Sequence, residues 1–428
     1  MNILLTGASG FIGQHLYIRL RQEGHRVVAA IREAEQFKMV FADAETIAVD
    51  YSRDHSANAW LPRLSGIDIV INAVGIIQQT AFQRFSDLHQ KAPSALFDAC
   101  ELAGVRRVMQ ISALGAEAGA TSQYHQSKFA ADQHLAAKAL DWAILRPSIV
   151  YGPGAKSTGF FRALAALPVT PLVNAGEQLI QPVHIDDLVT AVIVCIEEEL
   201  AVKAEIDLVG PEPLSFKAYL QCQRQWLGLG DLRPLSIPYR LARPLVKMGG
   251  LLKIGPVNSE SLDMLIQGNT APVAPLVEHL GFIPRSVENE LKRTPSQVAD
   301  RWYAGLYFMP GVLRGCIALL WIMTGLCSLL LYPEVKSLDI LSQAGIEGVP
   351  ATLSLYMGGA IDLLLGLAMF SNRWMKPALI GQLLLTVTYT LIISCLLPEL
   401  WLHPFGPVTK NLPLITATLC LLVIWRKT

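Results

Sequence analysis

A tyrosine and a lysine four residues apart are the first side chains in this sequence whose spacing suggests chemistry. In "SQYHQSK", Tyr124 and Lys128 stand at i and i+4, so a helix presents both on one face. A nearby ammonium lowers the pKa of a phenol, which then passes a proton to or from a substrate oxygen. Ser112 ends the apolar segment before them, where its hydroxyl can orient that oxygen. We therefore predict a catalytic set of Ser112, Tyr124 and Lys128; the alternative is a tyrosine and lysine that only line a binding site.

A glycine-rich turn near the N-terminus supplies the context for these residues. The segment "NILLTGASGFIGQHLYIRLRQEG" is an apolar run, a TGxxGxxG turn and then a helical pattern. Gly7 permits the tight turn, Gly10 lets the backbone approach a pyrophosphate, and Gly13 permits close packing of helix on strand. The pattern predicts a dinucleotide whose phosphates lie at the helix N-terminus. The predicted contacts are Thr6, Gly7, Ser9, Gly10, Phe11, Ile12 and Gly13.

The end of the next strand bears on the choice of cofactor. "HRVVAAIRE" ends at Arg32, nineteen residues after Gly13, where an acidic residue commonly holds the ribose of NAD. The fork of an arginine suits a 2′-phosphate, so we predict NADP in preference to NAD. Glu33 is near enough to serve NAD, and it keeps that alternative open.

Further apolar segments alternate with helical patterns, which predicts an α/β fold with a doubly wound parallel sheet. Ligands of such sheets bind at the carboxyl ends of the strands. There Asp50 can accept a hydrogen bond from the adenine amino group. The small residues of "NAVG" let a cofactor lie against the backbone, and the predicted contacts are Asn72, Ala73, Val74 and Gly75.

The C-terminal part has a different composition. Of the 70 Asp, Glu, Lys and Arg residues, only 12 fall in residues 311–428. Four apolar runs follow, at about 311–331, 352–371, 377–397 and 411–425, each near the length that spans a bilayer. They predict an all-α four-helix transmembrane bundle. Asp362 lies inside the second run, either as a proton relay or paired with Arg314 or the backbone.

Basic residues predict the orientation of the bundle. Five fall on one side of the predicted spans: Arg314, Arg373, Lys376, Arg426 and Lys427. The opposite loops hold only Lys336 and Lys410. The sequence begins with a strand and not with a signal peptide. Both observations predict a multi-pass protein of the inner membrane with both termini cytoplasmic.

Charge and cysteine usage exclude several classes of function. The formal net charge is zero, so nothing indicates a nucleic-acid partner. The seven cysteines form no CxxC pair, and the nine histidines show no metal-ligand spacing. We expect free thiols and no metal. The basic, proline-broken stretch of residues 211–305 fits either a small substrate lobe or a segment on a membrane surface.

In order along the chain, "TGASGFIG", "NAVG", Ser112, "YHQSK", "RPSIVYGPG" and "QPVHIDDLVTAV" resemble extended and atypical short-chain dehydrogenases/reductases. The resemblance covers about residues 1–230 and is closest to the branch of the 39-kDa-type accessory subunit of respiratory complex I. It implies a seven-stranded Rossmann fold with Ser112, Tyr124 and Lys128 as the catalytic set. It also implies that Lys128 holds the nicotinamide ribose.

The same resemblance implies roles for four later residues. Pro147 and Ser148 would lie beside the nicotinamide, and His184 and Asp187 would lie on the substrate side. Residues 308–428, with their "HPFGP…KN" element, resemble DoxX-like membrane proteins, which makes a quinone or another lipid a candidate partner.

Together these predictions describe three domains: a Rossmann domain over 1–230, a lobe or linker over 231–307 and a transmembrane domain over 308–428. The expected function is a membrane-anchored NAD(P)H-dependent oxidoreductase or epimerase acting on a hydrophobic, lipid-like or quinone-like substrate at the cytoplasmic face. The alternative is a non-catalytic NAD(P)H-binding module that stabilises or regulates a membrane complex.

Overall fold

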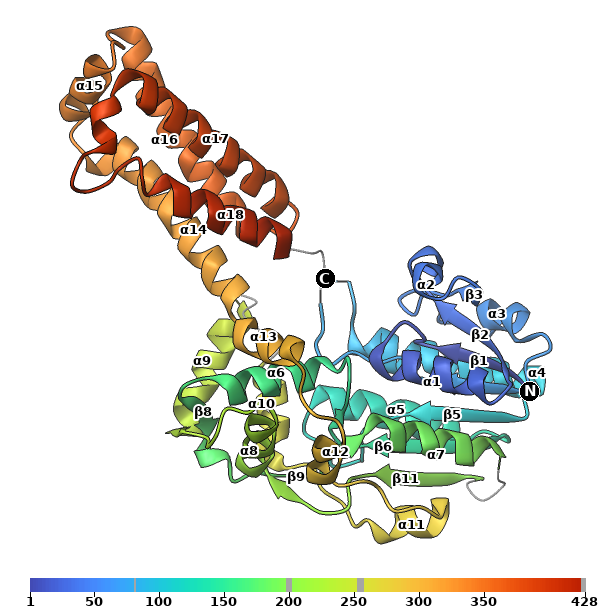
Figure 1. Cartoon of the computed structure of the whole chain (residues 1–428). Coiled ribbons are helices and arrows are strands. Elements are labelled where there is room, and N and C mark those ends of the chain that lie inside the picture. The colour runs from blue at the N-terminus through green and yellow to red at the C-terminus, as the bar shows by residue number, and fades with distance from the viewer. Residues whose placement is uncertain (81, 198–201, 252–257, 425–428) are drawn as a thin grey trace. The chain divides into compact units, whose positions relative to one another are not determined.

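A seven-stranded parallel sheet organises the N-terminal part of the chain (Figure 1). The computed structural model describes residues 1–428 except 81, 198–201, 252–257 and 425–428. The strand order is β11-β6-β5-β4-β1-β2-β3. The strands are β1 (Asn2–Thr6), β2 (Arg26–Ile31), β3 (Glu45–Ala48), β4 (Ile69–Asn72), β5 (Arg107–Ile111), β6 (Asp141–Pro147) and β11 (Ala204–Leu208).

Helices cover both faces of this sheet, because alternate strand residues point to opposite sides. Ile3 and Leu5 of β1 join one hydrophobic core, whereas Leu4 joins the other. The first core includes residues of α1 (Phe11–Gln22), α2 (Ala34–Val40), α7 (Ile185–Glu197) and α11 (Ala274–Leu280). The second includes residues of α3 (Ala57–Trp60), α4 (Ala92–Ala103) and α5 (Gln123–Ala136). The predicted doubly wound sheet is confirmed.

A smaller lobe follows the carboxyl ends of the last strands and has a core of its own around Tyr219 and Leu220. Its strands pair in twos: β7 (Val150–Tyr151) with β10 (Val183–His184), β9 (Leu179–Ile180) with β12 (Leu214–Ser215), and β8 (Thr170–Val173) with β13 (Pro234–Ile237). Its helices are α6 (Lys156–Ala166), α8 (Phe216–Trp226), α9 (Tyr239–Leu251), α10 (Ser259–Gln267), α12 (Val287–Arg293) and α13 (Val298–Leu306).

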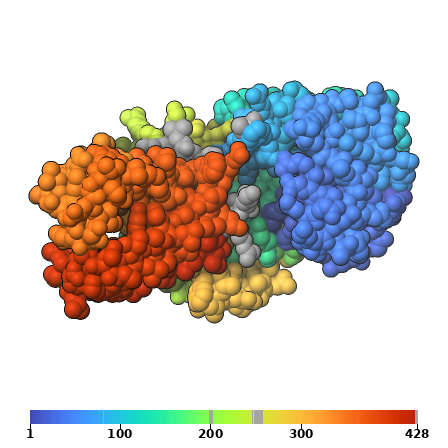
Figure 2. Space-filling view, turned by 90° about the horizontal axis from the view of Figure 1, so that it is seen from above, coloured from blue at the N-terminus to red at the C-terminus, as the bar shows by residue number. Residues whose placement is uncertain are grey.

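Contacts divide the chain into two units, Met1–Gly305 and Leu306–Thr428. The second unit contains α14 (Met309–Leu326), α15 (Glu334–Gln343), α16 (Val349–Ala368), α17 (Met375–Leu396) and α18 (Asn411–Ile424). Figure 2 shows the surface of this second unit in orange and red. Four of them, α14, α16, α17 and α18, contact one another as the predicted bundle.

Three helical segments of the described chain are long and apolar enough to cross a membrane: Val298–Leu331, Val349–Ala368 and Met375–Leu396. The fourth predicted span corresponds to α18, which has 14 residues and is shorter than such a segment. At 1.5 Å per residue it reaches about 21 Å, against roughly 30 Å of hydrocarbon. The three longer predicted spans are matched by segments of sufficient length, and the fourth, predicted to be the shortest, corresponds to the shorter apolar helix α18.

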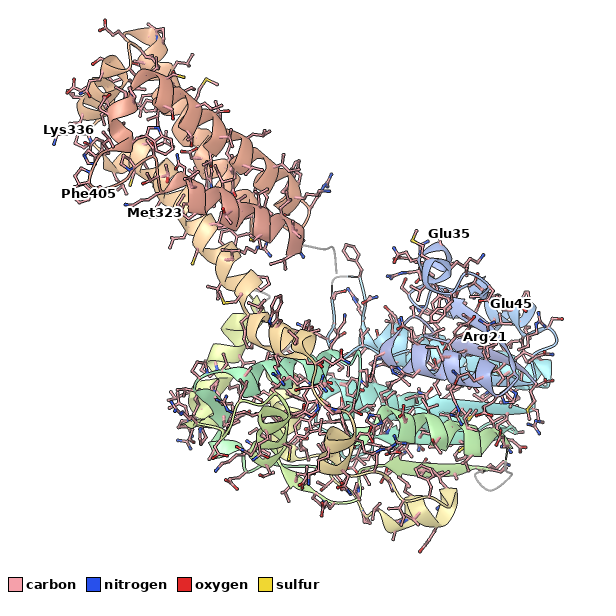
Figure 3. All side chains as sticks on the ribbon, in the orientation of Figure 1. Arg21, Glu35, Glu45, Met323, Lys336 and Phe405 are labelled. Atoms are coloured by element: carbon pink, nitrogen blue, oxygen red, sulfur yellow. The ribbon has the colours of Figure 1, made fainter. Side chains whose placement is uncertain are left out.

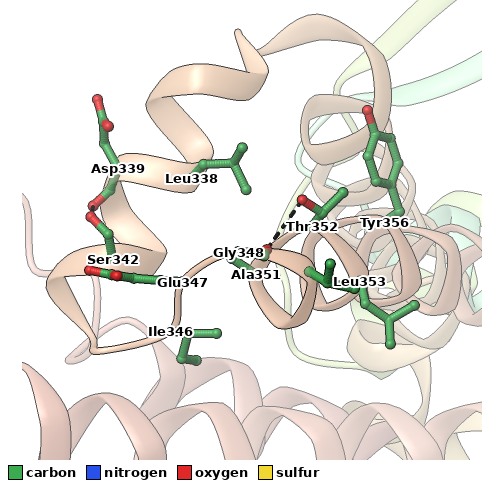
Figure 4. Close-up of a pocket in the computed structure, with 11 residues that line it drawn as sticks. Leu338, Asp339, Ser342, Ile346, Glu347, Gly348, Ala351, Thr352, Leu353 and Tyr356 are labelled. Carbon is green, nitrogen blue, oxygen red and sulfur yellow. Dashed lines mark hydrogen bonds between the residues drawn. The ribbon is translucent and has the colours of Figure 1, made fainter.

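Glycines let α14 and α16 approach closely, as small residues do between membrane helices. A Cβ built on Gly325 would lie 2.7 Å from the Gly359 carbonyl oxygen, and one on Gly366 would lie 2.8 Å from the Ile322 nitrogen. The two helices therefore pack backbone against backbone. Beside them, α15 and the start of α16 line an open pocket of about 700 Å³, whose wall includes Leu338, Leu353 and Tyr356 (Figure 4).

The ends of the bundle differ in charge. Arg314 donates to the Met369 carbonyl oxygen and approaches Asn372 at 3.5 Å, so it lies at the end that holds Arg373. Lys336 and Phe405 both lie toward the other end of this unit (Figure 3). This arrangement matches the predicted grouping of Arg314 with Arg373. Arg426 and Lys427, which that prediction also used, lie outside the described residues.

Candidate active site

The turn between β1 and α1 has the geometry of a phosphate site. Gly7 has φ +70°, and a Cβ there would lie 2.8 Å from backbone atoms of Ala73. A Cβ on Gly13 would lie 2.0 Å from the Gly7 carbonyl oxygen, so helix and strand touch through the glycines. Helix α1 starts at Gly10 without a side-chain cap and without an acidic residue in its first turn. Its first N–H groups therefore suit an anion such as a pyrophosphate.

The predicted adenosine side lies after β2 and β3. The Arg32 side chain is exposed, and its Nη2 lies 3.6 Å from Glu33 Oε1. Asp50 Oδ1 accepts from both the backbone N–H and the hydroxyl of Ser52, which holds the pKa of Asp50 below its usual value. The charge of Arg32 lowers that pKa further. In the predicted arrangement, Arg32 would bind the 2′-phosphate of the ribose and Asp50 would accept a hydrogen bond from the adenine. Both roles stay predictions.

The side chains of Thr6 and Asn72 belong to a buried network. Both are fully buried, and Asn72 Oδ1 accepts from Thr6 Oγ1 at 2.7 Å and from the Tyr51 hydroxyl at 2.8 Å. Asn72 Nδ2 donates to Gln110 Oε1 at 2.6 Å. These side chains join β1, β4 and β5 under the binding edge. If either residue contacts a cofactor, it would do so through its backbone atoms. The cofactor-binding assignments of Thr6 and Asn72 stay predictions.

Helix α5 carries the predicted tyrosine and lysine. Ser122 caps it by accepting from the His125 N–H, which fixes where the helix begins. Lys128 is buried, and its Nζ donates to the Val74 carbonyl oxygen at 3.1 Å and to the Ile111 carbonyl oxygen at 2.9 Å. The helix thus delivers an ammonium to the carboxyl ends of β4 and β5, beside Gly75.

Tyr124 lies in an aromatic enclosure. Its half-buried ring makes edge contacts with Phe85, His89 and His125, with centroid distances of 5.3 to 5.9 Å. Burial raises the pKa of Tyr124 to about 12, and the charge of Asp132 adds to the rise. The expected lowering of this pKa by Lys128 is therefore wrong for the protein alone, because desolvation dominates.

Asp132 is a functional candidate that the sequence reasoning missed. It is fully buried, accepts from the Ser112 hydroxyl at 2.5 Å and lies 3.6 Å from Arg146 Nε. Burial raises its pKa to about 6, and its charge raises the pKa of Lys128 against the larger lowering by burial, to about 8. Asp132 stands one turn after Lys128, a spacing that could have identified it. The predicted substrate-orienting role of Ser112 remains a prediction, since its hydroxyl is bonded to Asp132.

His89 is a second residue that sequence reasoning did not find. Its Nε2 accepts from the Ile76 N–H at 3.0 Å, so the ring proton is on Nδ1, which donates to Ser127 Oγ at 2.9 Å. Ser127 in turn donates to the Tyr124 carbonyl oxygen at 2.7 Å. Burial, together with the charge of Lys128, lowers the pKa of His89 to about 2. His89 therefore ties the loop after β4 to α5 through both of its ring nitrogens.

The four residues placed by resemblance have structural partners. Pro147 ends β6, and the Ser148 hydroxyl donates to the Gln181 carbonyl oxygen at 2.6 Å. His184 Nδ1 accepts from the Asp186 N–H. Asp187 is buried and accepts from the backbone N–H and Nε of Arg285 at 2.9 and 2.8 Å. Asp187 thereby fixes the segment before α12 to α7, and its predicted substrate role stays a prediction.

The lobe contacts α5 directly. Glu260 of α10 accepts from the Tyr124 backbone N–H at 2.9 Å, and Gln267 donates to Thr121 Oγ1 at 2.6 Å. Both bonds meet the first turn of α5 or the loop before it. The lobe therefore helps to position the helix that carries Tyr124.

Asp362 is 4% exposed inside the second unit. Its Oδ1 has no hydrogen-bond partner among the residues that the structure describes. Arg314 donates instead to the Met369 carbonyl oxygen, and no ion pair joins Arg314 and Asp362 among the described residues. Pairing of Asp362 with helix backbone stays a prediction. The proton-relay alternative stays a prediction.

Comparison with known proteins assigns both units. Residues 7–163 match the NAD(P)H-binding family, and residues 318–419 match the DoxX-like family. The chain therefore joins an NAD(P)H-binding domain with a Rossmann fold to a DoxX-like membrane region. The family matches confirm the two resemblances drawn from the sequence.

Individual curated relatives share 30% or less of their residues with this chain over the aligned parts described below. A ceramide reductase of Caulobacter vibrioides is 30% identical over 187 residues, which are 43% of this chain and 57% of that protein. Subunit 9 of the NADH dehydrogenase 1 alpha subcomplex of Arabidopsis thaliana is 24% identical over 254 residues, 56% of this chain and 61% of that protein. The chain thus spans less than two thirds of the length of these relatives.

Solved structures share the fold. The UDP-glucose 4-epimerase of Thermotoga maritima superposes with a TM-score of 0.54 at 18% identity, over 69% of this chain and 97% of that one. MoeE5 in complex with UDP-glucose and NAD gives 0.51 at 23%, over 68% and 96%. These similarities show an epimerase-like Rossmann architecture.

Proposed function

We propose that the protein is a membrane-anchored NAD(P)H-dependent oxidoreductase of the short-chain dehydrogenase/reductase type. One observation carries the proposal: in an NAD(P)H-binding domain, α5 brings the Lys128 ammonium to the carboxyl ends of β4 and β5, and Tyr124 stands one turn earlier on the same helix. Ligands of parallel sheets bind at those ends. If the hydride returned to the same substrate, the same residues would serve an epimerase.

The chemistry of the site follows from the residues present. The glycine turn and the uncapped start of α1 fit a dinucleotide, which supplies a hydride when bound. In reduction of a carbonyl, the hydride would reach carbon while the Tyr124 hydroxyl gives its proton to oxygen. Lys128 would stabilise the tyrosinate left behind, and Asp132 would favour the charged form of Lys128. In total, the carbonyl group takes up one hydride and one proton and becomes an alcohol.

The proposed substrate class is a lipid or quinone-like molecule at the cytoplasmic face. Ile77 and Phe82 are 59% and 88% exposed in the loop that leads to Phe85 beside Tyr124. Gln79 anchors this loop by donating to Gln123 Oε1 at 3.1 Å. Apolar side chains at the rim of a site and a membrane unit in the same chain both favour a hydrophobic substrate. A relative whose name is ceramide reductase supports the same class.

Lipid and metabolite profiling tests the proposal. A deletion strain would be compared with strains that carry the wild-type protein, Tyr124→Phe or the control Tyr332→Phe, which removes an exposed hydroxyl from the membrane unit. We expect Tyr124→Phe to reproduce the lipid change of the deletion and Tyr332→Phe to behave as wild type. A wild-type profile for Tyr124→Phe would refute catalysis.

A non-catalytic role in a membrane complex is the second candidate. The high pKa of Tyr124 disfavours proton transfer, and Lys128 is bonded to two backbone carbonyl oxygens. Both features suit a site that binds a nucleotide without catalysing a reaction. The similarity to a subunit of NADH dehydrogenase supports it. In that case native gels of solubilised membranes would show a complex that survives Tyr124→Phe and is lost when nucleotide binding is abolished.

A further inference from the structure

An apolar stripe runs along the exposed side of α13. Val298, Trp302 and Leu306 stand at i, i+4 and i+8, and they are 64%, 69% and 55% exposed. Residues at this spacing lie on one face of a helix. Met309, at the start of α14, is 48% exposed. Three large apolar side chains on one face, with a tryptophan at the centre, are unusual on a water-facing helix.

The opposite side of α13 is packed onto the lobe. Ala304 is 2% exposed, and Asp300 lies 3.5 Å from Arg162 of α6. The Tyr303 ring lies so close to α6 that a Cβ on Gly159 would meet it at 3.0 Å. Residues 298–305 of the helix therefore belong to the first unit, and Leu306 is the first residue of the second.

Length decides what can cover the stripe. The apolar segment that starts at Val298 continues to Leu331 and has 34 residues. Helix α14 and the five-residue helical turn after it, Met309–Leu331, have 23 residues and extend about 35 Å, against roughly 30 Å of hydrocarbon. These residues are long enough to span the hydrocarbon without α13. The first residues before a span meet the headgroup region, where tryptophan is enriched and amphipathic helices lie in the plane of the membrane.

We propose that α13 is an interfacial helix whose face of Val298, Trp302 and Leu306 binds the headgroup–acyl boundary of the bilayer. Continuity with the span at Met309 identifies lipid as the occupant. Because α13 is packed against α6, this contact with the bilayer would be made by a helix of the first unit. This inference does not depend on the reaction that the site performs.

Photo-crosslinking of the full chain tests it. The protein would be placed in nanodiscs of phosphatidylethanolamine and phosphatidylglycerol with p-benzoylphenylalanine at position 302. Leu102, 70% exposed near the end of α4, is the matched control, and Leu319, 60% exposed in α14, is the positive control. After irradiation, intact mass measures lipid adducts. We expect adducts at 302 and 319 and none at 102, with thermal unfolding unchanged.

A second measurement guards against local disturbance by the probe. With the probe at Val298, Trp302→Glu should abolish the lipid adduct, whereas Leu102→Glu should leave it intact. Position 302 labelled no more than position 102 while 319 is labelled would overturn the proposal. A cross-link from 302 to another protein chain in place of lipid would overturn it as well.

Discussion

Lys128 is a buried cation whose protonation sets a pH limit for the proposed reaction. Burial lowers the pKa of Lys128 to about 8 from its usual value of 10.5. Below pH 8 the ammonium is present, and above it the folded protein loses the charge. We therefore expect kcat/KM to fall by about tenfold per pH unit above pH 8, measured with purified protein in nanodiscs.

The same pKa has an opposite effect on stability. Between pH 8 and 10.5 the unfolded chain binds the proton that the folded chain has released, so the free energy of unfolding gained from this site rises with pH. The alkaline decline in activity should therefore occur without thermal destabilisation by Lys128. Parallel melting curves would separate the two effects.

Asp132 should influence the pH above which kcat/KM falls. Its carboxylate raises the pKa of Lys128, so Asp132→Asn removes that support and should move the alkaline limb to lower pH. Asp43→Asn, in an exposed pair with Arg21, is the control and should leave the limb unchanged. An unchanged limb in Asp132→Asn would show that the carboxylate acts only in packing.

Arg32 tests the choice of cofactor. Loss of a charge-assisted pair with a 2′-phosphate costs about 1.5–3 kcal/mol, so Arg32→Ala should weaken NADPH binding by roughly ten- to a hundredfold. NADH binding should stay the same, as should both affinities in Arg19→Ala, which removes an exposed arginine of α1 paired with Glu23. Equal affinity of the wild type for the two nucleotides would contradict the preference for NADP.

At the scale of elements, α1 and β1 depend on a contact that no side chain tolerates. A Cβ on Gly13 would lie 2.0 Å from the Gly7 carbonyl oxygen, so Gly13→Ala must move the helix off the strand. We expect a loss of stability of about 1–3 kcal/mol, with loss of nucleotide binding. Thermal unfolding and NADPH titration would measure both. Gly119→Ala, with open space around its Cα, is the control.

The loop after β4 and helix α5 also act together. His89 and Lys128 each bond to that loop, through Ile76 and Val74, while Ser127 carries the contact on to Tyr124. These hydrogen bonds fix the loop after β4 and helix α5, which would flank the nicotinamide, relative to each other. The lobe adds a third anchor through Glu260.

For the whole molecule, the membrane topology is the main expectation. Arg314 and Asn372 meet at one end of the bundle, next to Arg373, and that end should face the cytoplasm. Reporter fusions at Thr428 and near Gly345 would test it. We expect a cytoplasmic signal at Thr428 and a periplasmic signal near Gly345. A periplasmic signal at both positions would show that α18 does not cross the membrane, whereas a cytoplasmic signal near Gly345 would reverse the assignment.

The sequence by itself determined the architecture and most of the site's location. The glycines of the first turn, the alternation of apolar segments and the drop in charge after residue 310 are local signals, because each depends on neighbours in the chain. They were sufficient for the parallel sheet, the nucleotide turn and the membrane region. Tyr124 and Lys128 were readable for the same reason, since i and i+4 share a helix face.

Tertiary structure alone decided the electrostatics and the partners. Asp132 and Ser112 are twenty residues apart, and His89 reaches Ser127 across two elements, so no local pattern pairs them. The pKa of Tyr124 rose where the sequence predicted a fall, because burial, which no spacing reveals, outweighs the nearby ammonium. The side chains of Thr6 and Asn72, expected to contact the cofactor, instead bond within a buried network, and sequence spacing did not reveal that burial either. What a side chain faces depends on which distant segments pack against it, and only the folded chain brings them together.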